Sequence, residues 1–286
     1  MNQELFYRTD PWFPHPVGAP RHRGNLTRVN SSSPAAAAGT WPLGDLTVNR
    51  LGFGAMRLTG SQPFAKGGLP SDRGESIAVL RRAVELGVNH IDTAAFYFSP
   101  LRSANELINT ALGPYPADLV ITTKVGPGRD SWGEWHSARP DQLRGQVEEN
   151  LRQLGRDHLD VVNWRNQRGT ASIADHVGAL AQLRDGGLIR HLGVSGVTPG
   201  QLAEALAIAP VVCVQNRYGI GAIPQEHRFV DACGEQGVAF VPYFTIAGAG
   251  AGAGATGAER AEVLATGRAH GVERRKENSS GQFLQS

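Results

Sequence analysis

The fold of this chain is constrained most by a regular alternation of two kinds of segment between Leu51 and Tyr243. Short runs rich in β-branched and aliphatic residues predict buried strands. Longer stretches between them, in which apolar residues recur at spacings of three and four, predict amphipathic helices. Seven strands are expected, at Leu51–Met56, Val88–Thr93, Leu119–Lys124, Leu159–Asn163, Ile189–Ser195, Val211–Gln215 and Val238–Tyr243.

Helices are predicted in most of the intervals between these strands, at Glu75–Leu86, Asp141–Leu154, Ile173–Leu183, Gln201–Ile208 and Phe229–Cys233. Asp72 and Thr198 are typical helix starts, and Gly87, Gly155 and Gly237 are typical helix ends. A helix that ends at a glycine and leads into a buried strand, repeated along the chain, is typical of βαβ units and a parallel sheet.

Seven strands of this kind are one short of an eightfold βα barrel. Before them, Trp41–Val48 predicts a hairpin that covers the floor of the barrel. After them, Ile246–Gly257 is Gly/Ala low-complexity sequence, Glu259–Ala269 predicts one more helix, and Glu273–Ser286 is polar with no eighth apolar strand. We therefore expect an α/β fold of the TIM (β/α)8 type whose eighth βα unit is missing, with two unpaired strand edges.

The composition fits a globular protein, with 286 residues, 41% hydrophobic and 19% charged residues and a mean hydropathy of -0.26. We expect a disordered extension over residues 1–40, a barrel over residues 41–270 and a polar tail over residues 271–286. A net charge of +2 without a basic block gives no support for a nucleic-acid partner. No apolar run reaches the roughly 18 residues of a membrane helix, so we expect no membrane partner. The oligomeric state is left open.

Two cysteines, Cys213 and Cys233, form neither a CxxC pair nor a disulfide framework. The first forty residues contain no apolar core of a secretory signal. Both observations favour a reduced protein in the cytoplasm. The histidines show no shared spacing of metal ligands, and we expect no metal.

In a βα barrel the active site is built from the C-terminal ends of the strands. Asp92 ends the second predicted strand, Tyr97 follows it, and Lys124 ends the third. A phenol with a pKa near ~10 is a poor acid at neutral pH, and a neighbouring ammonium group favours phenolate and lowers that pKa. With a carboxylate to hold the ammonium, Tyr97 is predicted to protonate a carbonyl oxygen as hydride reaches the carbon.

Other strand ends offer groups for a nicotinamide ring. Ser195 and Gln215 can bond an amide such as the carboxamide, and Tyr243 offers an aromatic face on which the ring can stack. Arg165, near the end of the fourth strand, is a candidate for stabilising an oxyanion. The sequence gives nearly equal support to a surface arginine in a basic loop with Arg168.

Six segments resemble the aldo-keto reductase family and occur in the order of that family. The pairing of IDTA and a following tyrosine with a later TTK is the most specific part of this resemblance. It implies a TIM barrel that transfers hydride from NADPH to aldehydes and ketones without a metal. The segments are LGFGAMRLTG, ELGVNHIDTAAFY, ITTKVG, LRQLGRDHLDVV, LRDGGLIRHLGVS and VVCVQNRY.

The resemblance implies that Tyr97 is the proton donor, that Asp92 and Lys124 are its partners, and that Ser195, Gln215 and Tyr243 hold the nicotinamide. Met56, at the end of the first strand, and Asp92 are also expected to contact the cofactor. The sequence departs from the family in three places. Arg165 stands where a histidine is usual, Gly196 replaces the asparagine after the serine, and the strand and helix that bind the adenosine 2′-phosphate are not found.

The sequence thus predicts an NADP(H)-dependent oxidoreductase acting on small carbonyl substrates, with Tyr97, Lys124, Asp92 and Arg165 as catalytic residues. Two alternatives stay open. One is an inactive barrel remnant that senses cofactor or binds a partner, suggested by the missing eighth unit. The other is a Schiff-base lyase using Lys124, which leaves Tyr97 and Gln215 without a role.

Overall fold

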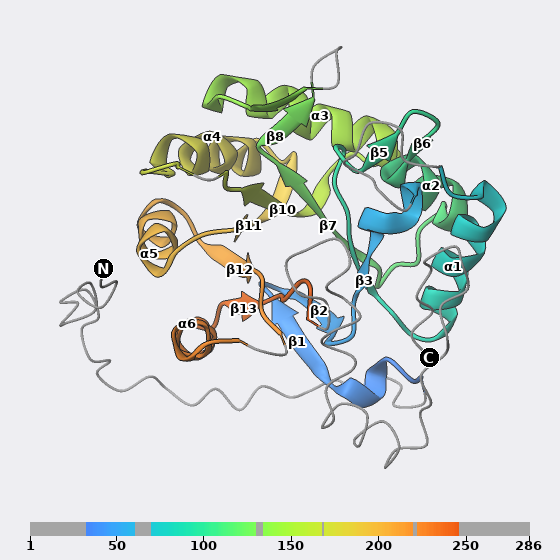
Figure 1. Cartoon of the computed structure of the whole chain (residues 1–286), viewed down its shortest axis with the longest axis horizontal. Helices are drawn as coiled ribbons and strands as arrows, with labels where there is room; N and C mark the ends of the chain where they lie inside the picture. Colours follow the sequence, from blue (N-terminus) through green and yellow to red (C-terminus); the bar gives the residue numbers. More distant parts are fainter. Residues whose placement is uncertain (1–32, 61–69, 130–133, 168, 220–221, 246–286) are drawn as a thin grey trace, which may run out of the picture. The chain divides into compact units, whose positions relative to one another are not determined.

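The computed structural model describes residues 33–60, 70–129, 134–167, 169–219 and 222–245. Its centre is a sheet of seven parallel strands whose spatial order follows the chain, so each strand lies beside the next (Figure 1). All seven predicted strands are confirmed. In order they are β3 (Phe53–Gly54), β4 (His90–Asp92), β7 (Val120–Val125), β10 (Leu159–Arg165), β11 (Ile189–Ser195), β12 (Val211–Gln215) and β13 (Ala239–Phe240).

Helices follow the strands and pack on the outer side of the sheet, as βαβ units require (Figure 1). Their apolar positions are buried against it, for example Leu80, Val147 and Leu180. The five predicted helices are confirmed, with shifted ends. The described helices are α1 (Arg73–Glu85), α2 (Ala104–Leu112), α3 (Leu143–Leu154), α4 (Ala174–Asp185), α5 (Pro199–Ile208) and α6 (Pro224–Glu235), with short 3-10 turns η1 (Ala36–Ala38), η2 (Ala55–Thr59) and η3 (Pro140–Gln142).

Helix α2 was not predicted from the sequence. It begins after Ser103, whose hydroxyl accepts a hydrogen bond from the Glu106 N–H. Its buried face contains Leu107 and Ile108, but also Asn105, which is fully buried. An asparagine on the core side breaks the apolar pattern, and this is why the helix was missed.

The predicted hairpin is confirmed as β1 (Thr40–Leu43) paired with β2 (Leu46–Asn49). Leu43 and Val48 pack with Val120, Val161 and other residues inside the sheet, so the hairpin covers the barrel floor. Two further hairpins were not predicted, because their strands are only two or three residues long. They are β5 (Phe98–Ser99) with β6 (Arg102–Ser103), and β8 (Pro127–Arg129) with β9 (Trp135–Ser137).

Within the described residues the sheet ends at β3 on one side and β13 on the other. The expectation of a missing eighth βα unit depends on residues 246–286, which lie outside the described residues. The same holds for the predicted helix at Glu259–Ala269, the tail at residues 271–286 and residues 1–32 of the predicted extension. In the part of the chain that is described, no helix has the length and apolar character needed to cross a membrane.

Helix α5 tests how much a predicted helix start stabilises the fold. Thr198 Oγ1 accepts a hydrogen bond from the Gln201 N–H at 3.2 Å, and Gln201 Oε1 accepts one from the Thr198 N–H at 3.1 Å. Thr198→Ala removes one acceptor, so we expect the free energy of unfolding in urea to fall by about 1 kcal/mol. Thr198→Ser keeps an acceptor and should lose much less. Equal losses in both variants would rule out capping as the cause.

Candidate active site

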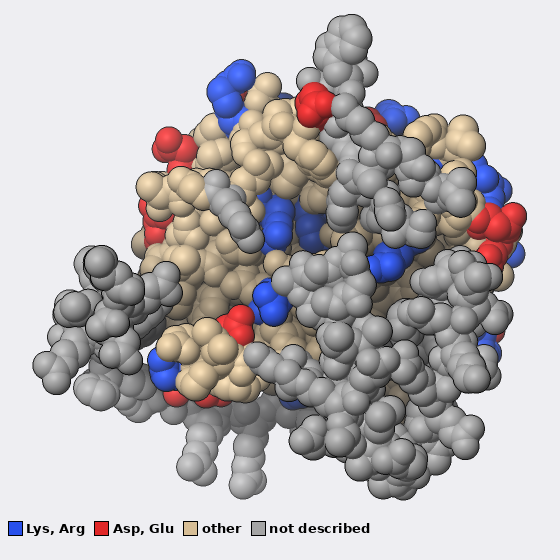
Figure 2. All heavy atoms as spheres, in the orientation of Figure 1, with Lys and Arg blue, Asp and Glu red and all other residues tan. Residues whose placement is uncertain are grey.

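The residues singled out from the sequence line one cavity of about 1410 Å³, which extends from the floor hairpin, at Leu43 and Val48, to the C-terminal ends of the strands. Residues from both edge strands contribute to its lining. Figure 2 shows the hollow near the middle of the molecule, with Lys and Arg side chains inside it. The structure therefore brings together every predicted site residue: Met56, Asp92, Tyr97, Lys124, Arg165, Ser195, Gln215 and Tyr243.

Asp92 and Lys124 form a buried ion pair across the neighbouring strands β4 and β7. Lys124 Nζ lies 2.5 Å from Asp92 Oδ1 and also donates to the Thr93 carbonyl at 3.1 Å. The Lys124 side chain is 5% exposed and the Asp92 side chain is 17% exposed, so solvent screens the ion pair little. The parallel register sets their approach, because Asp92 lies opposite Thr122 and their side chains share one face with Lys124.

Tyr97 completes this group from the segment after β4. Lys124 Nζ lies 4.8 Å from the centre of the Tyr97 ring, and the two side chains are hydrogen-bonded. The backbone holds the tyrosine in place, since its N–H donates to the Ala94 carbonyl and its carbonyl accepts from the Ala104 N–H. The convergence predicted from strand-end spacing is therefore present in the structure.

The expected pKa shift of Tyr97 was wrong in sign. Burial raises the pKa of Tyr97 above its ordinary value, and this outweighs the opposing effect of the Lys124 ammonium. The sequence could show the ammonium but not the depth of the phenol. Tyr97 therefore keeps its proton throughout the neutral range.

Burial acts to lower the pKa of Lys124, but Asp92 and Tyr97 more than compensate, and the pKa is raised. A Schiff-base lysine must lose its proton before it attacks a carbonyl. Lys124 is instead held as an ammonium in an ion pair, so the geometry disfavours the lyase hypothesis.

A buried polar network behind the ion pair fixes β4 and β7 in register. Thr93 donates to Asn105 at 2.8 Å, and Asn105 donates to Asn150 at 2.9 Å. Thr123 donates to the same Asn150 oxygen at 2.5 Å. These groups join the two strands to α2 and α3, so helix packing and the position of Lys124 are linked. Nothing in the sequence pattern marked this network.

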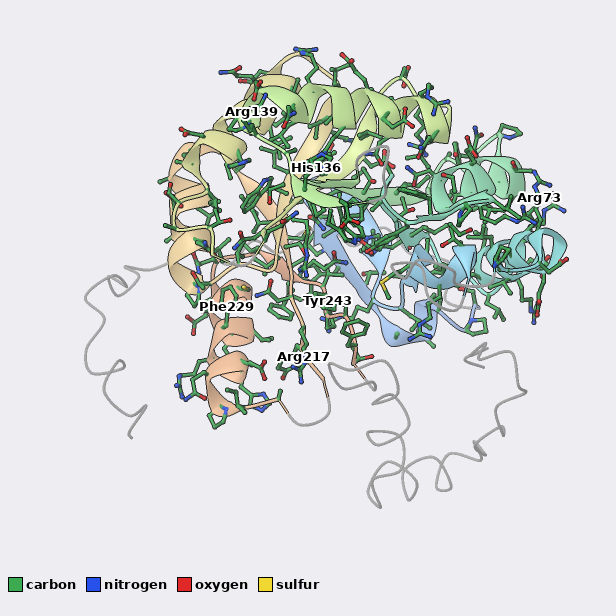
Figure 3. The ribbon with its side chains drawn as sticks, turned by 45° about the horizontal axis from the view of Figure 1, so that its top comes forward. Arg73, His136, Arg139, Arg217, Phe229 and Tyr243 are labelled. Atoms are coloured by element: carbon green, nitrogen blue, oxygen red, sulfur yellow. The ribbon has the colours of Figure 1, made fainter. Side chains whose placement is uncertain are left out.

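A second group of side chains lies at the ends of β10, β11 and β12. Arg165 Nη1 donates to Ser195 Oγ at 3.2 Å and to Tyr243 Oη at 3.1 Å. Arg165 is half-buried and lines the cavity, which favours a place in the site over a surface loop. Figure 3 shows Tyr243 after β13, beside Arg217, with which it forms a backbone bridge.

Gln215 stands out in this group because its Oε1 atom is buried and has no hydrogen-bond partner among the described residues. Such an atom is destabilising unless a ligand or water completes it. Asp92 Oδ2 is likewise buried and has no hydrogen-bond partner among the described residues. Both atoms belong to residues that line the cavity.

Sequence reasoning missed an aromatic wall beside Tyr97. Phe96 lines the cavity and packs edge-on against Tyr97, with ring centres 5.1 Å apart. Trp135 on β9 meets the other side of Phe96, at 6.0 Å. Trp135 is 41% exposed, more than a core tryptophan. Its hairpin was not predicted, so no signal placed it near the site.

The model of the Aldo/keto reductase family matches residues 50–263. The chain is 45% identical over 219 residues to a pyridoxine 4-dehydrogenase of Escherichia coli K12, covering 74% of each chain. It is 39% identical over 224 residues to an uncharacterised oxidoreductase of Schizosaccharomyces pombe, C215.11c, covering 77% of this chain and 70% of that one.

The chain belongs to the aldo/keto reductase family. Among solved structures, the aldo-keto reductase AKR11C1 of Bacillus halodurans in its holo form aligns with a TM-score of 0.59 and 26% identity. That alignment covers 69% of this chain and 62% of the other, so this chain spans less than two thirds of that reductase. The TIM-barrel character predicted from the sequence is confirmed, in a family of oxidoreductases that act on carbonyl compounds.

Aldo/keto reductases use nicotinamide cofactors, and the residues present here fit one. A carboxamide carries both a donor and an acceptor. The unpartnered Gln215 Oε1 can accept from its NH₂ group, and the Ser195 hydroxyl can donate to its oxygen. Tyr243 presents a ring beside these two groups. The donors, acceptors and ring of these three residues are thus chemically compatible with a nicotinamide.

The stability of the fold should depend on the buried Lys124–Asp92 ion pair. Asp92→Asn leaves the Lys124 ammonium buried without a counter-charge, and we expect the free energy of unfolding to fall by about 3 kcal/mol. Because the pKa of Lys124 is raised above its ordinary 10.5, this stabilisation is present below pH 10.5 and is lost as pH rises further. Urea titrations of the wild-type protein and the Asp92→Asn variant at pH 7 measure the difference in their free energies of unfolding.

Asp141→Asn is a matched control, because it breaks the exposed Arg139–Asp141 pair, both of whose side chains are 67% exposed. We expect a much smaller loss from that change, because solvent screens an exposed ion pair. A loss for Asp92→Asn no larger than that of the control would show that the buried pair contributes little.

Proposed function

We propose that this aldo/keto reductase is an NADP(H)-dependent enzyme that reduces aldehydes and ketones to alcohols with Tyr97 as the proton donor. One observation carries this proposal. The Tyr97 phenol, the Lys124 ammonium and the Asp92 carboxylate meet in one buried contact at the cavity. Our preference for NADP(H) over NAD(H) follows the family resemblance.

Each of the three residues has a separate role in the proposed proton transfer. Burial keeps Tyr97 protonated, so the phenol is ready to donate to a carbonyl oxygen. As the proton leaves, the phenolate forms beside the Lys124 ammonium, which stabilises it in a site shielded from water. Asp92 holds the ammonium in position. A bound nicotinamide supplies the hydride that the carbonyl carbon receives.

The remaining predicted residues are assigned to positioning the cofactor and polarising the substrate carbonyl. We assign Met56, Asp92, Ser195, Gln215 and Tyr243 to cofactor binding, as all five line the cavity. The permanent charge of an arginine at this rim favours the negative charge that develops on the substrate oxygen. Arg165 is therefore the fourth catalytic residue.

For the substrate we propose a planar aromatic aldehyde. The relative from Escherichia coli is named for oxidation of pyridoxine at position 4. The reverse reaction reduces the corresponding aldehyde, pyridoxal. Phe96 lines the cavity next to Tyr97 and suits a flat ring there, while Trp135 packs against Phe96 from outside the cavity lining. An inactive remnant is not favoured, because the relatives are oxidoreductases and the site residues share one cavity.

Tyr97→Phe tests the role of the phenol. We expect kcat for pyridoxal reduction to fall at least about 100-fold, because the proton donor is lost, while the Kd for NADPH stays unchanged. NADPH fluorescence gives the Kd and absorbance gives the rate. Tyr115→Phe is the matched control, since the Tyr115 hydroxyl donates to the Leu154 carbonyl at 2.7 Å and does not line the cavity.

The pH profile adds a second measurement. Because the pKa of Tyr97 is raised above 10.0, reduction should show no titration of this group up to pH 10. A wild-type rate that falls through pH 8, or a Tyr97→Phe variant that keeps its rate, would overturn the assignment. Failure of the wild-type protein to bind NADPH at millimolar concentration would remove the function altogether.

Phe96→Leu and Trp135→Leu test the aromatic wall. Phe96→Leu removes the aromatic ring at the cavity and Trp135→Leu removes the ring that packs against it, so kcat/KM for pyridoxal should fall about tenfold more than kcat/KM for propanal in the first variant and less in the second. The ratio of the two values, measured in one assay series, cancels any general damage to the site. A parallel fall for both aldehydes would show that these rings do not select the substrate.

A further inference from the structure

Arg165 is anchored to two of the groups proposed to hold the nicotinamide. It lies opposite Ser195 in the pairing of β10 with β11. Its Nη1 atom donates to Ser195 Oγ at 3.2 Å and to Tyr243 Oη at 3.1 Å, and its guanidinium carbon lies 5.4 Å from the centre of the Tyr243 ring. A ring held by Ser195 and Tyr243 would therefore lie next to a guanidinium.

The charge of Arg165 is not balanced locally. No ion pair joins it to a carboxylate in the part of the chain that the structure describes. The nearby Lys124–Asp92 pair is neutral as a unit. Since arginine stays protonated at every pH of interest, this end of the cavity carries a fixed positive charge.

The nicotinamide ring is positively charged when oxidised and uncharged when reduced. We infer that Arg165 makes this site distinguish the two oxidation states, binding the reduced cofactor more tightly than the oxidised one. The inference rests on the proposed function. It assigns Arg165 a task separate from polarising the carbonyl, because the discrimination exists with no substrate present.

The preference has a direct consequence for the direction of the reaction. If the reduced cofactor binds more tightly by some factor, the equilibrium between the two bound forms shifts toward the reduced form by the same factor. The oxidised cofactor then leaves more readily after each turnover. On the enzyme this preference opposes the hydride-transfer step of carbonyl reduction, because that step oxidises the bound cofactor, but it favours the release of the oxidised cofactor that must follow each reduction.

The size of the effect follows from Coulomb's law. Two like charges about 6–8 Å apart, at an effective dielectric constant of about 20, change a binding constant on the order of 30- to 100-fold. Water at the open rim reduces this. We therefore expect the wild-type Kd for NADP⁺ to exceed that for NADPH by at least about tenfold at moderate salt.

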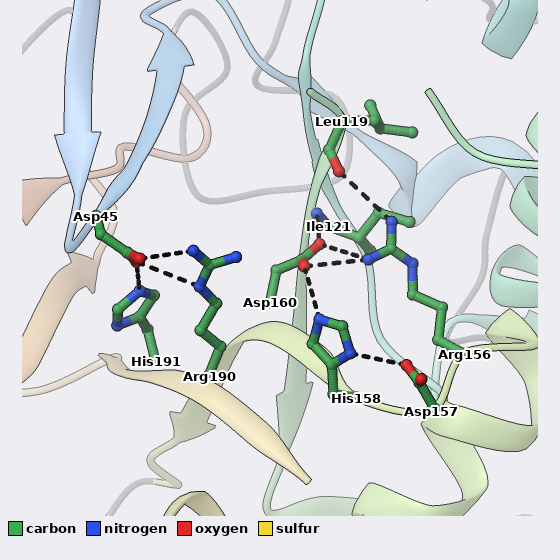
Figure 4. Close-up of polar contacts among 9 residues, drawn as sticks. All are labelled: Asp45, Leu119, Ile121, Arg156, Asp157, His158, Asp160, Arg190 and His191. Atoms are coloured by element: carbon green, nitrogen blue, oxygen red, sulfur yellow. Dashed lines mark hydrogen bonds and ion pairs between the residues drawn. The ribbon is translucent and has the colours of Figure 1, made fainter. Parts of the chain in front are cut away.

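The test measures both dissociation constants without substrate, by fluorescence titration for NADPH and calorimetry for NADP⁺. Arg165→Lys keeps the charge and should keep most of the ratio, whereas Arg165→Gln removes the charge and should reduce the ratio about tenfold, chiefly through tighter NADP⁺. Arg190→Gln is the matched control. Arg190 is paired with Asp45 at the opposite end of β11 (Figure 4), and its loss should leave the ratio unchanged.

Arg165→His makes the ratio of the two dissociation constants depend on pH, which a purely structural role of Arg165 would not do. Histidine titrates near pH ~6.5, so the ratio should be high at pH 5.5 and fall toward the Arg165→Gln value by pH 8. The wild-type ratio should not change with pH over that range.

The results of these titrations distinguish failure of the inference from failure of the proposed function. If wild-type protein binds both forms with a ratio below about three, the inference is wrong and the proposed function stands. The same conclusion follows if Arg165→Gln and Arg165→His, both folded by circular dichroism, keep the wild-type ratio. If neither form binds, the proposed function and the inference fail together.

Discussion

The site depends on one interaction, the buried ion pair between Lys124 and Asp92. Two buried charges are stable only when each compensates the other and further hydrogen bonds satisfy them. Here the Thr93 carbonyl adds a second acceptor for the ammonium, and the Asn105–Asn150 pair holds the two strands in the register that the ion pair needs. The same pair is central to the proposed reaction, because it places a cation beside a phenol that burial alone would make a weaker acid.

Much of the fold was predictable because the signals are local. A buried parallel strand reads as a continuous aliphatic run, and a glycine marks the end of the preceding helix, as Gly155 does with its left-handed conformation at φ 65° before β10. Helix α2 escaped prediction because Asn105 faces the core, which makes sense only once Thr93 and Asn150 are known to meet it. A contact between residues distant in the chain decided that element, and periodicity does not record such contacts.

The site was predictable to the extent that it lies at strand ends. Asp92 and Ser195 end their strands and Lys124 is the second-last residue of β7, so the topology alone brings them to one rim. Two features were not accessible in this way. The sign of the Tyr97 pKa shift depends on burial, and the place of Arg165, inside the cavity or on the surface, depends on the partners it finds on β11 and after β13.

The two ends of the strands use charge differently. At the floor, Arg156 is paired with the buried Asp160, and Arg190 is paired with Asp45, so charges there serve the fold (Figure 4). At the rim, Arg165 has no carboxylate partner among the described residues, and the Gln215 Oε1 atom has no partner there either. Groups left incomplete in a buried site are destabilising on their own. Such groups are typically retained where a ligand completes them. In the proposed complex with a nicotinamide cofactor, the unbalanced guanidinium would lie beside a ring whose charge changes, and would favour the uncharged state of that ring.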